Sequence, residues 1–348
     1  MTDLTMQGDA ARRAARFLMT ASTDEKNRAL FEMAKGLLAE WEQILAANEQ
    51  DLAAAREAGM GEALLDRLAL NRERIEGMAQ GVEQVAALPD PVGEIVEGSV
   101  RPNGLQVQKV RVPLGVIGMI YEARPNVTSD AAALCLKAGN AVILRGGKEA
   151  ICSNRAVVGA LGRALERAGL PAACVQLVQD TSRESANAMM RMNGVIDVLI
   201  PRGGAGLIRS VVENARVPVI ETGVGNCHIF VDESADLEQA AAIVFNAKTT
   251  RPSVCNAAET LLVHGAIAQQ ALPRIAAELG KKNVQLRGCA RTCAILPQPM
   301  IATLIIAELL LSYPANCLQK TRFRGCRGLF FSLRSPLYQK PRPDGIPF

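Results

Sequence analysis

From residue 115 onward, continuous apolar runs alternate with segments of helical periodicity. The apolar runs do not alternate with polar residues, as strands with one exposed face do. Strands of this kind are buried on both faces, and helices between them imply that they run parallel. The pattern therefore predicts a doubly wound α/β domain that binds ligands at the carboxyl ends of its strands. The expected strands lie within 115–121, 140–146, 174–179, 195–201 and 217–223.

The chain before this domain is predicted to be helical. Residues 9–87 place apolar residues three and four apart, and Ser22 with Glu25 forms a capping box at the start of one helix. Two prolines then end the helical region. The sequence next alternates around Asn103–Gly104, a strong signal for a hairpin. We therefore expect a two-stranded arm at about 98–113.

A strand and a helix restart near residue 227, so a second domain is expected there. The expected organisation is a first domain with a helical N-terminus at 1–226, a second domain at 227–287 and an atypical end at 288–348. That last segment has eight Lys and Arg against two acids and carries +6, whereas residues 1–287 carry −2. Because the basic charge is confined to one end, nucleic acid is not an expected partner.

Several other classes of protein are also disfavoured. The first thirty residues carry charges throughout and show no secretory signal or transit peptide, which indicates a cytoplasmic protein or a processed organelle form. The apolar run at 300–311 contains Glu308 and is well short of the ~20 residues that span a bilayer, so no membrane association is expected. The nine cysteines form no CxxC pair, which argues against a metal site.

Two glycine turns follow expected strands and precede expected helices. The first is RGGKEA (145–150), and the second is PRGGAGL (201–207). The free amides and the dipole of a helix start favour an anion, so two such turns on one sheet fit the phosphates of a dinucleotide. Glycine turns after strands also arise for steric reasons alone. The GxGxxG fingerprint is absent, which argues against an ordinary Rossmann dehydrogenase.

Cys255 is the candidate nucleophile. It lies in TTRPSVCNAAETLLV (249–263), on a polar step between a helical run and an apolar run. Lys248 and Arg251 precede it closely, and nearby cations can lower the pKa of a thiol and increase its thiolate fraction. The same cations could equally belong to a solvated helix end, and free cysteines are often buried and inert. Burial is the expected state of three other cysteines, Cys135, Cys174 and Cys227.

Four long blocks of the chain match a known pattern. They are VPLGVIGMIYEARPNVTSDAAALCLKAGNAVILRGGKEA, IDVLIPRGGAGLI, PVIETGVGNCHIFVDESADL and NAKTTRPSVCNAAETLLV. Together they resemble the gamma-glutamyl phosphate reductase family, the proline-biosynthetic branch of the aldehyde dehydrogenase superfamily. The resemblance is continuous from the helical opening to about residues 286–288. It implies an aldehyde dehydrogenase-like fold with an NADP-binding domain at 1–226, a partial catalytic domain at 227–287 and the hairpin arm.

The resemblance implies an oxidoreductase that reduces L-glutamate 5-phosphate to L-glutamate 5-semialdehyde with NADPH and releases phosphate, in L-proline biosynthesis. Cys255 occupies the position of the superfamily's nucleophile. Its thiolate would attack the acyl phosphate and expel phosphate to leave a thioester, which hydride from NADPH would convert to the aldehyde. Such covalent catalysis divides one hard step into two easier ones. For full-length relatives, homo-oligomers and functional coupling to glutamate 5-kinase are implied.

The resemblance also implies roles for other residues. The oxyanion of the reaction would accept hydrogen bonds from the Cys255 amide and the Asn126 side chain, although Asn126 could equally be a turn former after proline. Arg251 would meet the substrate phosphate or α-carboxylate. Glu221 would hold the nicotinamide ribose or amide, or cap a turn. Two further groups would contact the cofactor: Arg145, Gly146, Gly147 and Lys148 near the adenosine ribose, and Arg202, Gly203 and Gly204 near the pyrophosphate or nicotinamide.

The end of the chain departs from the family pattern. An H[ST][DE]-type segment, a stretch of FGxGAE character and a final dimer-pairing strand, which family members carry after the nucleophile, are not found in the sequence. We expect residues 288–348 to be an out-of-frame or mis-spliced end. Half of the catalytic domain would then be missing and a sheet edge exposed, so we expect low stability and little activity. Two alternatives stay open: a non-phosphorylating aldehyde dehydrogenase and a non-catalytic nucleotide-binding remnant.

Overall fold

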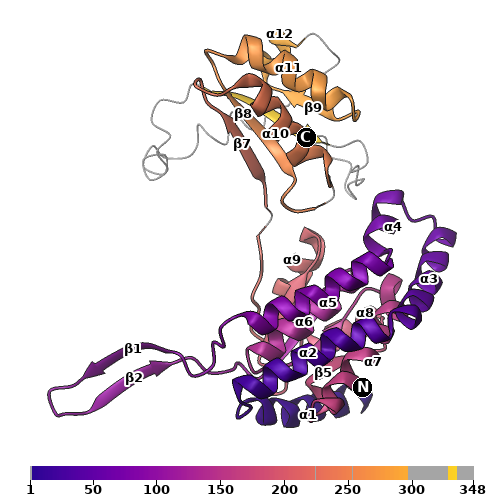
Figure 1. Cartoon of the computed structure of the whole chain (residues 1–348), viewed down its shortest axis with the longest axis vertical. Helices are drawn as coiled ribbons and strands as arrows, with labels where there is room; N and C mark the ends of the chain where they lie inside the picture. Colours follow the sequence, from indigo (N-terminus) through magenta and orange to yellow (C-terminus); the bar gives the residue numbers. More distant parts are fainter. Residues whose placement is uncertain (1, 224, 253, 297–327, 335–348) are drawn as a thin grey trace. The chain divides into compact units, whose positions relative to one another are not determined.

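The computed structural model describes residues 2–223, 225–252, 254–296 and 328–334, and the structural statements below refer to these residues. The chain divides into two compact units, residues 1–223 and 224–348, whereas the sequence places the boundary after residue 226. Each unit has a hydrophobic core of its own. Their helices and strands are labelled in Figure 1.

A four-stranded parallel sheet forms the centre of the first unit. Its strands are β3 (Val116–Tyr121), β4 (Ala141–Arg145), β5 (Val175–Leu177) and β6 (Val198–Arg202), in the order β5-β4-β3-β6. Every residue of β3 and the first four residues of β4 are buried, so both faces of the sheet are covered. The expected doubly wound α/β fold is therefore confirmed.

Five helices precede this sheet in the chain, and a further helix follows each of its strands. α6 (Pro125–Lys137) and α7 (Ile151–Arg167) follow β3 and β4, while α8 (Arg183–Met189) and α9 (Ala205–Asn214) follow β5 and β6. α1, α6 and α7 contact the strands, and α2 packs on α5, α6 and α7. The helical opening comprises α1 (Thr2–Leu18), α2 (Thr23–Ala39), α3 (Trp41–Glu57), α4 (Glu62–Leu68) and α5 (Arg72–Ala87).

The capping box predicted at the start of α2 is present. The Ser22 amide donates to Glu25 Oε2 at 2.7 Å, and the Glu25 amide donates to Ser22 Oγ at 3.2 Å. Two amides that a helix start leaves without an intrahelical partner are therefore satisfied by side chains. The local sequence alone determines where α2 begins.

The strand expected at 217–223 is not formed. Leu199 of β6 makes a single parallel bridge with Val219: its amide donates to the Pro218 carbonyl at 2.8 Å, and its carbonyl accepts from the Ile220 amide at 2.9 Å. A run that contains proline lacks one of the amide donors that a ladder needs. The segment therefore ends the sheet as one isolated bridge.

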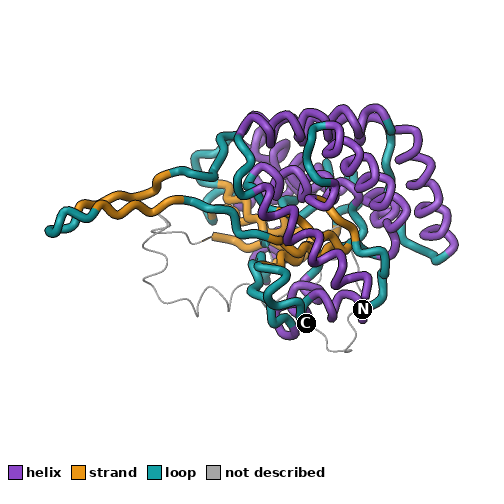
Figure 2. Tube along the Cα trace, turned by 90° about the horizontal axis from the view of Figure 1, so that it is seen from below, coloured by secondary structure: helices purple, strands orange, loops and turns teal. Residues whose placement is uncertain are grey.

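The predicted arm is an antiparallel hairpin of β1 (Ile95–Val100) and β2 (Gln106–Val110), which projects from the first unit (Figures 1 and 2). Its strands begin and end three residues earlier than the expected range of 98–113. The turn contains Gly104, whose φ of +85° is a conformation that glycine adopts without strain. Every residue of both strands is exposed, apolar ones included.

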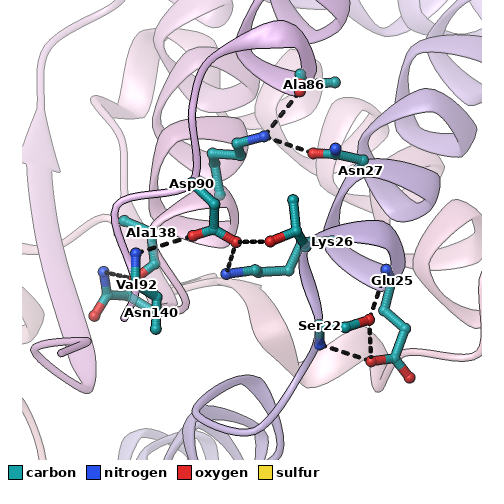
Figure 3. A network of polar contacts seen from close by, with 11 residues as sticks. Ser22, Glu25, Lys26, Asn27, Ala86, Asp90, Val92, Ala138 and Asn140 are labelled. Carbon is teal, nitrogen blue, oxygen red and sulfur yellow. Dashed lines mark hydrogen bonds and ion pairs between the residues drawn. The ribbon is translucent and has the colours of Figure 1, made fainter. Parts of the chain in front are cut away.

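A buried ionic network holds the loop that leads into the arm (Figure 3). Asp90, between α5 and β1, accepts from Lys26 Nζ at 2.6 Å, from Thr23 Oγ1 at 2.7 Å and from the Val92 amide at 3.0 Å. Burial would raise the pKa of Asp90, but these donors outweigh it and hold the pKa below its ordinary value. The Lys26 side chain is only 1% exposed, so its ion pair with Asp90 is shielded from solvent.

A second buried lysine extends the network. Lys137, the last residue of α6, donates to Asn27 Oδ1 at 2.6 Å and to the Ala86 carbonyl at 2.8 Å. Burial lowers the pKa of Lys137, an effect that the charge of Asp90 opposes. The network therefore ties α2, α5 and α6 to the loop before β1.

The second unit contains a mixed sheet in the order β7-β8-β10-β9. β7 (Cys227–Val231) runs parallel to β8 (Ala258–His264), and β10 (Gly328–Arg334) runs antiparallel to both β8 and β9 (Gln285–Gly288). The helices of this unit are α10 (Leu237–Thr249), α11 (Ala268–Gly280) and α12 (Ala290–Ile295). Its packed core reaches Leu296, beyond the expected end of the catalytic domain at residue 287.

Most of the expectations for the tail fall on residues outside the described ranges, including the apolar run at 300–311. The backbone of β10 pairs along the edge of β8 that faces away from β7, so β8 is an inner strand and β7 and β9 are the edge strands of this sheet. Within the described ranges, none of the helices combines the length and the apolar character that a membrane span requires.

Candidate functional site

The segment after β3 contacts both glycine turns. Because β3 lies between β4 and β6, its carboxyl end is next to the ends of both. A Cβ on Gly147 would lie 3.1 Å from the Ala123 amide nitrogen, and a Cβ on Gly203 would lie 2.7 Å from the Glu122 side chain. The Glu122 amide donates to the Arg202 carbonyl at 3.2 Å. The two turns therefore lie together at the end of the sheet where this fold binds ligands.

The first glycine turn has no room for a side chain. A Cβ on Gly146 would lie 2.2 Å from Asn154 Nδ2 and 3.2 Å from Tyr121 Cζ. Asn154 Oδ1 accepts from Thr128 Oγ1 at 2.8 Å, and the hydroxyls of Thr128 and Tyr121 are 2.8 Å apart. All three side chains are buried, and Asn154 Nδ2 has no hydrogen-bond partner among the described residues. This packing fixes the backbone of the turn.

Gly146→Ala should lower the free energy of unfolding of the first unit by roughly 1–3 kcal/mol, because the added methyl group collides with two buried side chains. Gly206→Ala is the matched control, since that position in α9 has open space around it and alanine is the better helix former. Urea unfolding followed by the fluorescence of Trp41, the chain's one tryptophan, measures both variants. Equal stability of the two variants would contradict the tight packing described for the first turn.

Protein carboxylates occupy the starts of the helices that follow the two turns. At α7, Asp51 accepts from the Cys152 amide at 3.1 Å and from the amide and hydroxyl of Ser153 at 2.7 and 2.6 Å. At α9, Glu122 Oε1 accepts from the Gly204 amide at 2.7 Å. Each helix dipole is thus met by a negative charge of the protein itself. A cofactor phosphate at the Gly204 amide would have to displace Glu122.

The cations of the two turns differ in their surroundings. Arg145 Nη2 donates to the carbonyls of Thr181 and Ser182 at 2.6 and 2.9 Å, so its guanidinium holds the loop between β5 and α8. Lys148 and Arg202 are exposed. The positive charges that an anionic ligand can reach directly at these turns are therefore those of Lys148 and Arg202.

Asn126 and Glu221, predicted near the reacting groups, belong to the first unit. Asn126 lies in the first turn of α6, where its Nδ2 donates to Asp130 Oδ2 at 3.1 Å and its carbonyl accepts from Ser129 Oγ at 2.9 Å. Glu221 is exposed. Because Cys255 belongs to the second unit, the roles of Asn126 and Glu221 at the nucleophile stay predictions.

Cys255 lies in the connection between α10 and β8. The Ala257 amide donates to the Val254 carbonyl at 3.2 Å, which makes Cys255 the first corner residue of a four-residue turn. Cys255 is exposed at this corner. Of the two interpretations that the sequence left open, an accessible thiol and an inert buried side chain, the structure agrees with the first.

The other cysteines have different environments. Burial raises the pKa of Cys135 and of Cys174 to about 12 in each case, and both are buried as the sequence predicts. The prediction that Cys227 is buried is wrong, because Cys227 is the first residue of β7 and is partly exposed. Its Sγ donates to the Cys255 carbonyl at 3.5 Å.

The two cations near Cys255 in the sequence have separate roles. Lys248, at the end of α10, is only 2% exposed, and its Nζ lies 3.6 Å from Glu259 Oε1 on β8. Arg251 is exposed in the connection itself. Arg251 is therefore the cation that an anionic substrate can meet in this loop. No cluster of metal-binding side chains occurs in the part of the chain that the structure describes.

Comparison with known proteins gives one consistent result. Residues 6–291 match the model of the aldehyde dehydrogenase family. The gamma-glutamyl phosphate reductase of Moorella thermoacetica is 60% identical over 297 residues, which cover 85% of this chain and 71% of that protein. The chain belongs to the gamma-glutamyl phosphate reductases of the aldehyde dehydrogenase family. The resemblance found in the sequence is confirmed.

Solved gamma-glutamyl phosphate reductases share the fold of this chain. The structure from Thermotoga maritima has a TM-score of 0.79 at 48% identity and covers 86% of this chain and 73% of its own. That from Saccharomyces cerevisiae has a TM-score of 0.58 at 34% identity, with 79% and 69% covered. Membership of the family implies a nicotinamide cofactor. The two glycine turns fit this group, because they lie at the carboxyl ends of parallel strands and carry the exposed charges of Lys148 and Arg202.

Three residues of this reductase that shape the site were missed by sequence reasoning. Glu122 directly follows a buried strand, and this position at the carboxyl end of the sheet could have drawn attention to it. Asp51 reaches the start of α7 from α3, about a hundred residues away, and no periodicity links the two. Asn154 lies on the buried face of α7. Nothing in the sequence pattern distinguishes this asparagine from the other small polar residues of the helix.

Proposed function

We propose that this chain reduces L-glutamate 5-phosphate to L-glutamate 5-semialdehyde with NADPH and releases phosphate. Its 60% identity to a protein named gamma-glutamyl phosphate reductase supports the substrate. The observation that carries the chemistry is the exposure of Cys255 at the corner of a turn, since a nucleophile must be accessible to the group it attacks.

Cys255 would act as the nucleophile. Its thiolate attacks the acyl carbon, the bond from that carbon to the phosphate oxygen breaks, and phosphate leaves with the electron pair. The Cys255 amide and the Asn126 side chain would donate to the oxyanion that forms. Arg251 would bind the phosphate or the α-carboxylate of the substrate. When bound, the nicotinamide cofactor would supply the hydride that reduces the thioester, and the Cys255 thiolate would leave to release the aldehyde.

NADPH is proposed over NADH from the charge at the turns. Lys148 is exposed beside the first glycine turn, where an ammonium group would pair with a 2′-phosphate on the adenosine ribose. Arg145 would contribute to the cofactor site indirectly, because its hydrogen bonds to the carbonyls of Thr181 and Ser182 hold the loop before α8. Arg202, Gly203 and Gly204 would approach the pyrophosphate or nicotinamide, and Glu221 would hold the nicotinamide ribose or amide.

Lys148→Ala should raise the KM for NADPH by about tenfold and leave the KM for NADH almost unchanged, because one charge-assisted contact to the 2′-phosphate is lost. Steady-state kinetics with the two nucleotides measure this. The matched control is Lys281→Ala, which removes an exposed lysine of the second unit that pairs with Glu278. An equal rise in KM for both nucleotides would contradict a 2′-phosphate contact.

The proposed reaction is tested in reverse, with glutamate semialdehyde, phosphate and NADP, by the absorbance of the NADPH formed. Dependence on phosphate or arsenate supports the reductase, whereas oxidation without either would favour the non-phosphorylating aldehyde dehydrogenase. Nucleotide binding without acylation of Cys255 by an acyl phosphate would favour the non-catalytic remnant. We expect this chain to react slowly. The dependence of the rate on phosphate, and not the size of the rate, therefore distinguishes the reductase from the dehydrogenase.

We further propose a cytoplasmic protein of a family whose full-length members form homo-oligomers and are functionally coupled to glutamate 5-kinase. The exposed apolar residues of β1 and β2, among them Ile95, Val100 and Val107, support association through the arm. A reducing compartment would keep the Cys255 thiol available. Acyl phosphates hydrolyse readily in water, which favours a close supply by the kinase. Light scattering of the purified chain measures the assembly.

A further inference from the structure

Two thiols lie close together at the start of the second sheet. Cys227 is the first residue of β7, and it pairs with Ala258, the first residue of the parallel neighbour β8. Cys255 precedes Ala258 by only three residues. The starts of neighbouring parallel strands lie side by side, so the turn with Cys255 is next to Cys227. The contact from Cys227 Sγ to the Cys255 carbonyl oxygen, 3.5 Å long, is direct.

This contact limits the separation of the two side chains. A carbonyl oxygen lies about 2.4 Å from the Cα of its own residue, so Cys227 Sγ is within about 6 Å of the Cys255 Cα. Disulfides join residues whose Cα atoms are about 4.4–6.8 Å apart. That 6 Å limit joins a sulfur to a Cα and not two Cα atoms, so a bond between the two sulfur atoms needs a rearrangement of the turn that carries Cys255.

The turn that carries Cys255 lies at the surface. A Cβ on Gly225 would lie 3.5 Å from the Cys255 carbonyl oxygen, an ordinary van der Waals distance, so Gly225 borders the turn without a side chain of its own. Cys255 and its neighbour Asn256 are exposed. Segments with few buried contacts move at low cost in free energy.

Access to solvent separates this pair from the buried cysteines. Cys255 is exposed and Cys227 is partly exposed, whereas Cys135 and Cys174 are buried. Oxidation of cysteine follows exposure and thiolate character, so a small oxidant in solution meets Cys255 before the buried thiols. A second thiol beside an accessible one is the arrangement of redox-sensitive sites.

We propose that Cys227 is a resolving thiol for Cys255, so that a hydroperoxide converts the pair to a reversible disulfide. The Cys255 thiolate attacks the peroxide, the O–O bond breaks, and the sulfur gives up two electrons to become a sulfenic acid while hydroxide or an alcohol leaves. The Cys227 thiolate then attacks that sulfur, the S–S bond forms, the S–O bond breaks, and the oxygen leaves as water after taking up a proton. A dithiol reductant restores both thiols. Capture by Cys227 protects Cys255 from irreversible oxidation to the sulfinic acid.

Peptide mapping of the full chain after treatment with hydrogen peroxide tests the proposal. Trypsin yields peptide 217–248 with Cys227 as its single cysteine and peptide 249–274 with Cys255 as its single cysteine. We expect a linked pair of these peptides in the oxidised wild type, and its loss on treatment with dithiothreitol. Cys255 oxidised without a link to Cys227, or linked mainly to another cysteine, would overturn the proposal.

A matched pair of variants adds a second measurement. In Cys227→Ser, the fraction of Cys255 that dithiothreitol can recover after peroxide should fall by about fivefold or more, since sulfenic acid without a resolving thiol is oxidised further. Cys293→Ser removes another partly exposed thiol of the same unit and should behave as wild type. Equal recovery in both variants would overturn the protective role. Neither measurement depends on turnover, so a failed reductase assay leaves this test intact.

Discussion

Cys255→Ser should lower the phosphate-dependent oxidation of glutamate semialdehyde by at least about 10³-fold, because a serine hydroxyl is not ionised at neutral pH and cannot form the thioester. The loss should fall on kcat, and the folded state should be unaffected, since the side chain is exposed and the substitution preserves its size. The absorbance of NADPH measures the rate. Intact mass after exposure to an acyl phosphate measures formation of the acyl-enzyme, which should occur in the wild type and be lost in the variant.

Cys152→Ser is the control for this experiment. Cys152 is a partly exposed cysteine of the first unit, and burial together with the nearby Asp51 carboxylate raises the pKa of its thiol, which disfavours the nucleophilic thiolate. It should retain the activity and the acylation of the wild type. Acylation of Cys255→Ser to the same extent as wild type, or acylation at a different cysteine, would remove Cys255 from the reaction.

Asp90→Ala should lower the free energy of unfolding of the first unit by about 3–5 kcal/mol, because Lys26 would be left buried without its carboxylate. Urea unfolding followed by Trp41 fluorescence reports on this unit, which contains the tryptophan. Glu49→Ala is the control: Glu49 and Arg56 form an ion pair in which both side chains are more than half exposed, and its loss should change little. A similar small effect for both variants would show that the buried pair does not stabilise the fold.

The same network predicts how stability depends on pH. The pKa of Asp90 is lower in the folded chain than its ordinary value, so the contribution of this carboxylate is complete above the pKa of an unfolded aspartate, about 4. It is lost as the pH falls through the lower, folded pKa. The difference in stability between wild type and Asp90→Asn should therefore shrink in acid. A difference that stays constant from pH 7 to pH 3 would contradict the assigned pKa direction.

The features that follow from local sequence could be predicted. Apolar runs identified β3, β4, β5 and β6 because a strand covered on both faces must be apolar throughout. Ser22 and Glu25 determine the start of α2 through contacts three residues apart. The hairpin was expected from Asn103–Gly104, and its position differs by three residues because the turn signal does not say how far each strand extends.

The features that depend on distant residues could not be predicted. A helix start favours an anion, but the sequence does not say whether that anion is a ligand or a side chain of the protein. At α7 it is Asp51 and at α9 it is Glu122, which reach these amides from other elements. The partial exposure of Cys227 was missed for a similar reason. An apolar strand pattern does not show which residues at the end of the strand are left exposed to solvent.

The glycine turn after β4 is enclosed by Asn154 and Tyr121, whereas Lys148 and Arg202 lie at the surface. Replacing an enclosed residue perturbs folding, while a surface side chain can be exchanged at little cost. Under the proposed function, changes of coenzyme during evolution, or in the laboratory, would proceed through Lys148 and Arg202 and leave the glycines untouched. Descendants that differ in the nucleotide they use would then inherit the same backbone at this turn.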